Sequence, residues 1–303
     1  MRLIYYSLAR LPSGDYDEQW VQSIRSLRKH NRHVRVCLFV FNGVSAQVQR
    51  EAERCDVRLM PMGNYCEWVQ RHHPRGSILA MYPALHKFLV LPEIDTTGVS
   101  QALFVDCDTF FFHDPELLFY TPVPCHWSAR EEPASRLSHC GYDPSGINEE
   151  LIGGIASAEG LHWVAPFNTG ICLQNHGIWR TFGQLRSTFL DLVWRLLVGL
   201  HTFGDNDGYD SEIRNAVLHT ASSYDIARAL PYPSNNSWIL DQVAMWLTFG
   251  HVHGFVLHLL PQDRVTQGPE FFDGNRQGHL PIVAHYFSAN QAEFFRHVQP
   301  LTG

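Results

Sequence analysis

The first half of the chain alternates strand-like and helix-like segments, and this order limits the folds that the chain can adopt. The strand-like runs are short and apolar, and the stretches between them show helical periodicity. The strand-like runs are residues 3–8, 34–41, 57–62 and 102–106, and the helix-like stretches are residues 20–27, 46–54 and 81–94. Such alternation is typical of βαβ units, so we predict an α/β fold with a mostly parallel central sheet flanked by helices.

The second half of the chain is less regular. Apolar side chains recur at helical spacing across residues 178–196, which predicts a long amphipathic helix, and residues 238–250 predict a shorter one. Residues 131–165 contain five glycines and are expected to form a long, partly irregular excursion, a kind of loop that often carries function. The remaining strand-like runs are residues 123–130, 167–175, 254–260 and 281–287.

The composition argues against several classes of protein. The formal net charge is -7, the pI is about 6.2, and no Lys/Arg-rich run stands out, so nucleic acid is not an expected partner. The seven cysteines are odd in number and form no C-x-x-C pair, which suits free thiols in a reducing compartment. The start lacks the pattern of a signal peptide, and the most hydrophobic long segment contains Asp191 and Arg195. We therefore expect a cytoplasmic protein without a transmembrane segment.

Two carboxylates, Asp106 and Asp108, lie at the end of the strand-like run 102–106. A strand that is apolar on both faces is central in its sheet, and ligands bind at the carboxyl ends of such strands in open α/β sheets. Residues two apart on an extended chain point the same way, so both carboxylates can face one hard cation that also holds a diphosphate. The alternative is that the two acids only cap the turn that follows.

The same pair of acids also begins the motif of a different class of enzyme. Haloacid-dehalogenase-type phosphatases carry D-x-D-x-T/V after a strand, and the first Asp of that motif is the nucleophile. In this chain Thr109 comes one position too early, and Phe110 stands where the motif has Thr or Val. The mismatch counts against a phosphatase.

Four segments together carry a resemblance to a known family. They read FVDCDTFFFHDPELLF, FNTGICLQNHGIWR, WILDQVAMWLTFG and IVAHYFSANQAEFF. In order and approximate spacing they resemble the conserved blocks of nucleotide-sugar glycosyltransferases of the GT-A fold, most like glycogenin and the bacterial lipopolysaccharide galactosyltransferases. The resemblance implies one GT-A-like domain over residues 1–303, in which 1–130 would bind the nucleotide and 131–303 would bind the acceptor and the sugar.

The resemblance implies a metal site. Asp106 and Asp108 match the D-x-D that holds Mn²⁺ and the nucleotide diphosphate, and His285 matches the late histidine that completes the site. An imidazole joined by two carboxylates suits Mn²⁺ better than Mg²⁺ or Ca²⁺, with Mg²⁺ as the alternative cofactor. Without the D-x-D, His285 would read as an ordinary residue at the end of a strand.

The resemblance also implies a sugar site. Asn168, Thr169 and Gly170 match a block whose Asn reaches the donor or acceptor sugar and whose Gly lets the backbone come close. Asp241 and Gln242 match a pair that lines the sugar pocket beside the reacting carbon. Read without the resemblance, the first block is a turn into a strand, and Asp241 is an acid that complements the dipole at the start of a helix.

Several positions depart from the pattern of this family. Members often have an Asp or Asn soon after the first strand, whereas this chain has the segment SLARLPSG, which begins at Ser7. The nearest basic residue before the D-x-D is Lys87, and the Gly and Lys that follow the histidine in close relatives are replaced in HYFSANQAEFF. Ser7 and Lys87 are therefore the candidates for further contacts with the nucleotide.

We predict a metal-dependent glycosyltransferase that moves a sugar from a nucleotide diphosphate donor, with UDP as the expected nucleotide, to an acceptor. Relatives that carry the pair found at Asp241 and Gln242 retain the configuration of the sugar, so retention is expected. Trp238 and the excursion 131–165 are candidates for the acceptor side. The sequence leaves open whether the acceptor is a glycan, a lipid-linked sugar, a protein or a small molecule. The alternative functions are a haloacid-dehalogenase-like phosphatase and an inactive module that binds nucleotide sugars.

Overall fold

The computed structural model describes residues 1–303 except 11–15, 95–97, 121–123, 133–146, 204–210, 235–238, 268–279, 287–293, 295, 297 and 299–303. The described strands are β1 (Arg2–Ala9), β2 (Arg35–Phe41), β3 (Val57–Gly63), β4 (Gln101–Val105), β5 (Thr109–Phe111), β6 (Trp127–Glu131), β7 (Phe167–Asn175), β8 (Leu257–Leu260), β9 (Val265–Gln267) and β10 (Val283–His285). The described α-helices are α1 (Asp17–His30), α2 (Ala46–Arg54), α3 (Tyr65–Gln70), α4 (Gly76–Leu79), α5 (His86–Leu89), α6 (Glu149–Ala158), α7 (His176–Phe203), α8 (Ser211–Thr220), α9 (Ser223–Ala227) and α10 (Leu240–Gly250). The described 3₁₀ helices are η1 (Pro83–Leu85), η2 (Leu91–Glu93) and η3 (Pro115–Phe119).

The central sheet has seven strands in the order β3-β2-β1-β4-β7-β6-β8. Neighbours from β3 to β4 are parallel, β7 pairs antiparallel with β4 and with β6, and β8 is parallel to β6. Within this sheet β7 therefore runs against the other six strands. The prediction of an α/β fold with a mostly parallel central sheet is confirmed.

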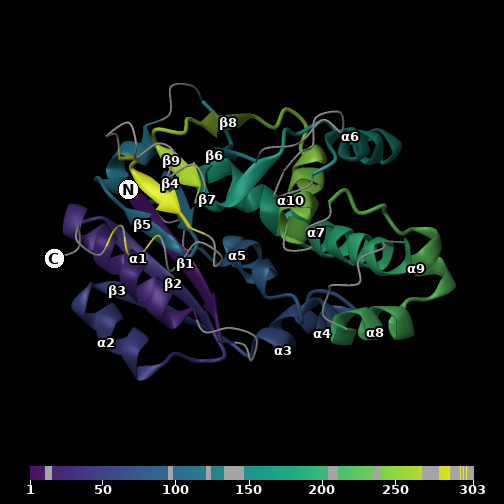
Figure 1. Ribbon diagram of the computed structural model, residues 1–303, viewed down its shortest axis with the longest axis horizontal. Coiled ribbons are helices and arrows are strands. Elements are labelled where there is room, and N and C mark those ends of the chain that lie inside the picture. Colours follow the sequence, from purple (N-terminus) through teal and green to yellow (C-terminus); the bar gives the residue numbers. More distant parts are fainter. Residues whose placement is uncertain are drawn as a thin grey trace.

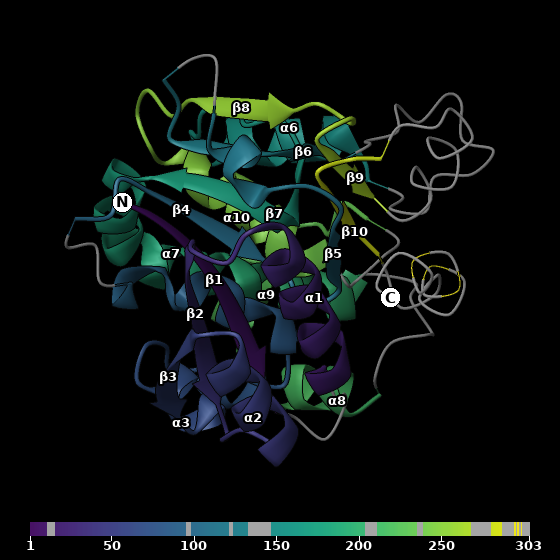
Figure 2. The same cartoon turned by 90° about the vertical axis from the view of Figure 1, so that its left-hand side faces the viewer.

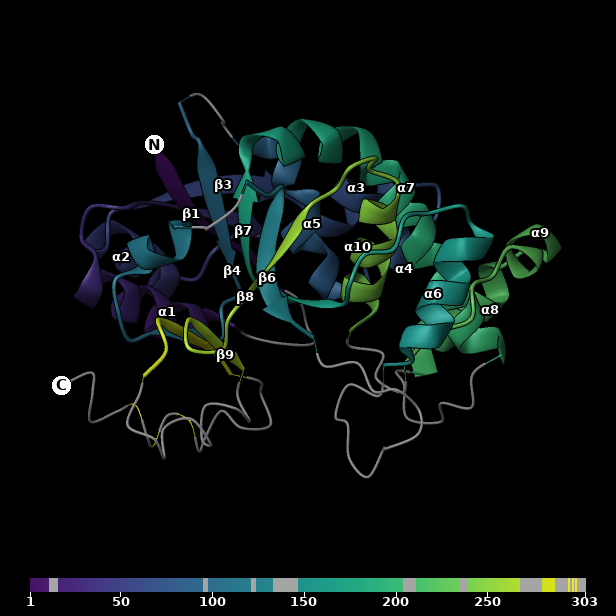
Figure 3. The same cartoon turned by 90° about the horizontal axis from the view of Figure 1, so that it is seen from above.

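Helices cover both faces of the central sheet, because successive side chains of its inner strands point to opposite sides. In β1, Ile4 and Tyr6 pack into the core beneath α1 and α2, while Leu3 and Tyr5 pack into the core shared with α7 and α10. Figure 1 shows α7 and α10 together at one side, and in Figure 3 the strands lie between α7 and α1. The sheet is thus the middle of three layers.

Several predicted elements agree closely with the structure. The predicted run 167–175 has the same bounds as β7, and residues 178–196 lie within α7. The helix expected over 81–94 was wrong in its continuity: α5 has four residues, and 3₁₀ turns flank it. Pro92 donates no backbone hydrogen bond and cannot continue a helix, and the residue before Pro83 is biased away from helical geometry. Tyr82, Leu85 and Leu89 are nevertheless all buried, as the predicted apolar face required.

Some elements were not predicted. The described part of the excursion 131–165 contains α6, and residues 133–146 lie outside the described residues. A second sheet of order β5-β10-β9 follows the D-x-D segment, and its strands β5 and β9 have three residues each. Such short runs show too little periodicity to be recognised. The pairing of β5 with β10 nevertheless brings His285 close to the segment that carries the two acids.

In the described part of the chain, no helix combines the length and the mean hydropathy that crossing a bilayer requires, and this includes the 28-residue α7.

Candidate active site

Asp106, Asp108 and His285 come together at the carboxyl end of β4. Asp106 directly follows β4, Asp108 precedes β5, and His285 ends β10 opposite Thr109 of β5. The His285 Nε2 lies 3.2 Å from Asp108 Oδ1 and 3.7 Å from Asp106 Oδ2. Backbone hydrogen bonds hold the two acids in place, since Asp106 N donates to Gly170 O over 2.7 Å and Tyr286 N donates to Asp108 O over 2.9 Å. The predicted trio therefore forms one cluster.

This cluster fits a divalent cation. One ligand atom from each of Asp106, Asp108 and His285 lies within 4.8 Å of the others. Among the described residues, these three form the one group of His, Cys, Asp or Glu with such spacing. Two carboxylate oxygens and an imidazole nitrogen suit Mn²⁺ or Mg²⁺, with nitrogen favouring Mn²⁺. Burial lowers the pKa of His285, but the carboxylates of Asp108 and Asp106 outweigh it and raise that pKa. A bound cation would take the place of that proton.

Gly170 makes room for the histidine. A Cβ built on Gly170 would lie 2.3 Å from Cε1 and 2.4 Å from Nδ1 of His285. The resemblance implied that this glycine lets the backbone come close. In the structure its close neighbour is the imidazole of His285.

Lys87 links the cluster of Asp106, Asp108 and His285 to Asp241. Its Nζ lies 2.8 Å from Asp241 Oδ2 and 3.6 Å from Asp106 Oδ2. Burial lowers the pKa of Lys87, and the charges of Asp106 and Asp241 outweigh this and raise it well above its ordinary value. Burial raises the pKa of Asp106 against the opposing effect of Lys87. Lys87 is therefore a buried cation that bridges two carboxylates from β4 and α10.

The block Asn168 to Gly170 lies in β7, beside the cluster. Asn168 Nδ2 donates to Glu132 Oε2 over 2.8 Å, and its Oδ1 accepts from Gly170 N over 2.8 Å. Thr169 faces α10, where its N donates to Gln242 Oε1 over 2.8 Å. These are strand residues with side chains fixed by neighbours, and no turn is formed at this point.

Asp241 and Gln242 begin α10 and are held against β7. Thr169 Oγ1 donates to Asp241 Oδ2 and to Gln242 Oε1, each over 3.3 Å. The side chain of Asp241 is only 1% exposed, and Lys87 is its counter-ion. Asn168 is bonded to Gly170, and Thr169 is bonded to Asp241 and Gln242. The five residues named by the resemblance for the sugar site therefore lie together, and their contact with a sugar stays a prediction.

Ser7 lies at the carboxyl end of β1. Its Oγ is 2.7 Å from His86 Nδ1, and its carbonyl accepts a long bond from Cys107 Sγ, the residue between the two acids. Burial, with a contribution from Lys87, lowers the pKa of His86 to about 3, so this imidazole is neutral. Ser7 is therefore near the cluster but bonded to a neighbouring histidine.

Two further residues at this site were not predicted. Glu132 is buried directly after β6 and accepts from Asn168, and Tyr16 precedes α1 near Asp108 and Asp106. Burial raises the pKa of Tyr16, and the charges of these two acids add to the effect. Two acids, Glu131 and Glu132, directly follow the strand-like run 123–130, and this pattern could have indicated Glu132 as a site residue. No local pattern indicated Tyr16. Trp238, proposed for the acceptor side, lies outside the described residues.

Comparison with known proteins places the fold. No protein-family model and no curated protein matches this sequence. The apo structure of the bifunctional glycosyltransferase WbbM matches with a TM-score of 0.53 and 14% identity, over 93% of this chain and 45% of that one. Mouse xyloside xylosyltransferase 1 matches with a TM-score of 0.47 and 10% identity, over 96% of this chain and 99% of that one. The galactosyltransferase LgtC, in complex with donor and acceptor sugar analogues, matches with a TM-score of 0.49 and 15% identity, over 94% and 86%.

These neighbours are GT-A glycosyltransferases, as the sequence resemblance implied. The protein has the GT-A fold, and its Asp106, Asp108 and His285 form a group with the composition of a metal site.

Proposed function

We propose that this protein is a metal-dependent glycosyltransferase that uses a nucleotide diphosphate sugar, with UDP as the expected nucleotide. The observation that carries the proposal is the joining of Asp106, Asp108 and His285 at the carboxyl end of β4. Ligands of open α/β sheets bind at this edge. Lys87 contacts both Asp106 of the cluster and Asp241, which is buried beside Gln242. The proposed diphosphate and sugar sites would therefore be adjacent.

Each group of residues has a task in this proposal. Asp106, Asp108 and His285 would hold Mn²⁺ or Mg²⁺, which supplies Lewis-acid stabilisation of the leaving diphosphate. Lys87 pairs with Asp106 and with Asp241 and so fixes both carboxylates in position. Thr169 holds the amide of Gln242, so that this side chain is oriented before a sugar arrives.

The proposed stereochemical outcome is retention. Asp241 is buried and paired with Lys87, which makes it a poor general base for an acceptor hydroxyl. We expect the leaving diphosphate to accept the proton of the acceptor, while Gln242 stabilises positive charge on the sugar. The test is the NMR coupling of the anomeric proton in product made from an α-linked donor. An axial–axial coupling in a gluco- or galacto-configured product would show inversion.

The first experiment is calorimetry of UDP binding with and without Mn²⁺, followed by a panel of nucleotide sugars assayed for hydrolysis. We expect UDP to bind only with Mn²⁺, and Asp108→Asn to abolish this binding while circular dichroism stays unchanged. Asp263→Asn is the matched control, because Asp263 is exposed and is not one of the three residues of the candidate metal site. Equal UDP affinity in Asp108→Asn and Asp263→Asn would contradict the metal assignment.

The same experiment separates the alternatives. A module that only binds nucleotide sugars would bind UDP with Mn²⁺ and leave every donor intact. A phosphatase of the haloacid-dehalogenase type would hydrolyse a generic phosphoester with Mg²⁺ and form an aspartyl intermediate on Asp106, without a need for UDP.

A further inference from the structure

Charge is distributed unevenly along the chain. Residues 25–58 hold eight Lys and Arg and three acidic residues, a net charge of +5. The rest of the chain holds 15 Lys and Arg and 27 acidic residues, a net charge of -12. The basic residues are separated by apolar and neutral ones, so no run stands out in the sequence. Asymmetry of this size points to an anionic partner for the positive part.

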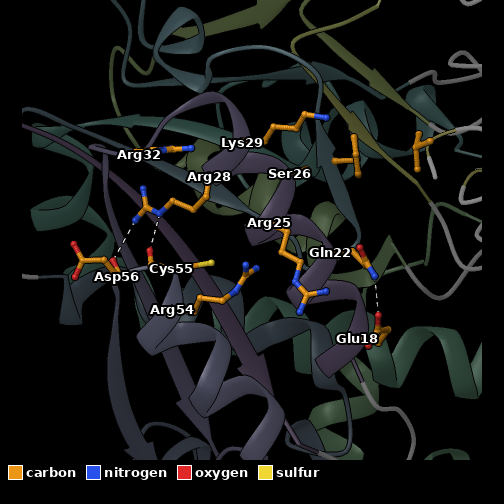
Figure 4. Close-up of a pocket in the computed structure, with 12 residues that line it drawn as sticks. Glu18, Gln22, Arg25, Ser26, Arg28, Lys29, Arg32, Arg54, Cys55 and Asp56 are labelled. Atoms are coloured by element: carbon orange, nitrogen blue, oxygen red, sulfur yellow. Dashed lines mark hydrogen bonds between the residues drawn. The ribbon is translucent and has the colours of Figure 1, made fainter. Parts of the chain in front are cut away.

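The fold gathers these residues on one surface. Helices α1 and α2 lie on the same face of the central sheet (Figure 2), and an open groove of about 1260 Å³ follows the outside of α1. Figure 4 shows the cations that line it. We call this surface the basic face, and it comprises Arg25, Arg28, Lys29, Arg32 and Arg54. Two carboxylates, of Glu18 and Asp56, also line the groove.

Arg25, Arg28 and Arg54 are fixed by contacts within the protein. Glu51, which is buried, accepts from Arg25 Nε over 3.0 Å and from Arg25 Nη2 over 2.9 Å, and it also pairs with Arg54. One carboxylate thus serves two guanidinium groups and leaves a positive charge in excess. Arg28 donates to backbone carbonyls, including Cys55 O over 2.7 Å and Val34 O over 2.9 Å. These acceptors are uncharged, so the bonds hold the guanidinium without cancelling its charge. These contacts hold the charge of the basic face in place at little entropic cost.

Lys29 and Arg32 form an exposed ridge beside a second groove. This groove has a volume of about 720 Å³, and Arg2 and Arg35 line it with them. The carboxylates of Asp114 and Glu116 also line it, and Glu116 pairs with Arg2. Its other lining residues include Met1 and Ser100, which precede β1 and β4. The ridge therefore lies at the amino ends of the parallel strands, whereas the candidate active site lies at their carboxyl ends.

Exposed apolar side chains accompany the cations at this edge. Leu117 is 46% exposed and Tyr120 is 59% exposed, and the Arg2 guanidinium lies 4.6 Å from the centre of the Tyr120 ring. Asn31, between Lys29 and Arg32, donates to Asp114 Oδ1 over 2.8 Å and so joins the ridge to the segment that carries Leu117. Cations beside an exposed tyrosine and an aliphatic side chain are suited to the boundary between lipid headgroups and acyl chains.

We propose that the basic face docks on a membrane surface rich in anionic phospholipids. Lys29 and Arg32 pair with headgroup phosphates, the fixed guanidinium groups of Arg25 and Arg54 add attraction, and Leu117 and Tyr120 enter the headgroup region. A cluster of four to eight Lys and Arg is typical of such recognition. The opening of the active site at the other end of the strands stays accessible from solution.

The test is cosedimentation of the full chain with vesicles of phosphatidylcholine alone and of equimolar phosphatidylcholine and phosphatidylserine. We expect binding only to the second, weakening as salt is added because the attraction is screened. A cation near an anionic surface contributes roughly fivefold to partitioning, so Lys29→Gln with Arg32→Gln should weaken binding by roughly 25-fold. Leu117→Ser with Tyr120→Ser should also weaken binding, while the salt dependence remains.

The matched control is Arg71→Gln with Arg214→Gln, which removes the same amount of charge at two exposed positions. Arg71 directly follows α3, and Arg214 lies on α8. Equal loss of binding in the two double variants would overturn the proposal, because overall charge would then be the cause. Absence of binding by the unchanged protein to anionic vesicles would also overturn it. So would binding to a DNA duplex through Lys29 and Arg32 in the absence of vesicle binding, since the partner would then be nucleic acid.

Discussion

The imidazole of His285 occupies the space where a side chain on Gly170 would be. A Cβ at this position would lie 2.3 Å from the ring, a separation that real Cβ atoms essentially never show. Neither residue can move freely, since Gly170 O accepts from Asp106 N and His285 pairs with β5 through its backbone. The glycine of β7 therefore determines where the third residue of the candidate metal site lies.

Gly170→Ala should weaken Mn²⁺ binding by displacing the ring of His285. Loss of support for a metal-binding histidine typically costs about 10- to 100-fold in affinity, and we expect a loss in this range. Electron paramagnetic resonance of free Mn²⁺ measures it without any assay of activity. Gly183→Ala is the matched control, because a Cβ there meets Pro92 at an ordinary 3.8 Å.

A double variant tests the cause of that effect. In a His285→Ala background the added methyl group has room, so Gly170→Ala should produce no further loss of Mn²⁺ affinity. If Gly170→Ala weakens binding by the same factor in both backgrounds, displacement of the imidazole is not the reason.

Lys87→Met should destabilise the fold. Lys87 and Asp241 are 9% and 1% exposed, so the variant leaves a buried carboxylate without its counter-ion. Breaking such a buried pair from one side costs about 3–5 kcal/mol of unfolding free energy. Urea unfolding measures the loss, and Lys87→Met with Asp241→Leu should recover much of it because both charges are gone. A loss within about 1 kcal/mol, as for surface ion pairs, would contradict this account.

Stability should depend on pH through His86. Burial, together with Lys87, lowers the pKa of His86 from an ordinary 6.5 to about 3 in the folded protein. The unfolded chain therefore binds this proton first, so the contribution of His86 is complete above pH 6.5 and is lost as the pH falls toward 3. His86→Gln keeps a partner for Ser7 without this titration. The difference in unfolding free energy between wild type and His86→Gln should change by a few kcal/mol across this window, and a constant difference would refute the prediction.

Gln242→Ala should lower kcat far more than it raises the donor KM, if the proposed transferase activity is present. The reason is that charge on the sugar develops mainly in the transition state, where the oriented amide acts. Thr169→Val is the comparison, because it removes the hydroxyl bonds of 3.3 Å but keeps the 2.8 Å bond from Thr169 N to Gln242. Its effect on kcat should be clearly smaller. A variant Gln242→Ala that changed only KM would show that this side chain binds the ground state.

Much of the fold could be predicted because its signals are local. Strands β1, β2 and β4 are mostly apolar runs, and α7 has an apolar stripe long enough to be recognised. The helix expected over 81–94 was wrong in its continuity, since a pattern of apolar side chains does not register the backbone limits imposed by proline. Strands β5 and β9 escaped prediction because three residues carry no period.

For the candidate site, the sequence by itself determined that Asp106 and Asp108 follow a buried strand and face the same way. It also supplied His285, Asn168 and Asp241 as candidates, through a resemblance that local patterns alone would not have given. The tertiary structure decided how they meet: the pairing of β10 with β5 brings His285 to the acids, Lys87 joins Asp106 to Asp241, and Gly170 leaves space for the imidazole. These contacts join segments far apart in the chain. Their geometry depends on strand register and on the packing of whole elements, which no local spacing of residues encodes.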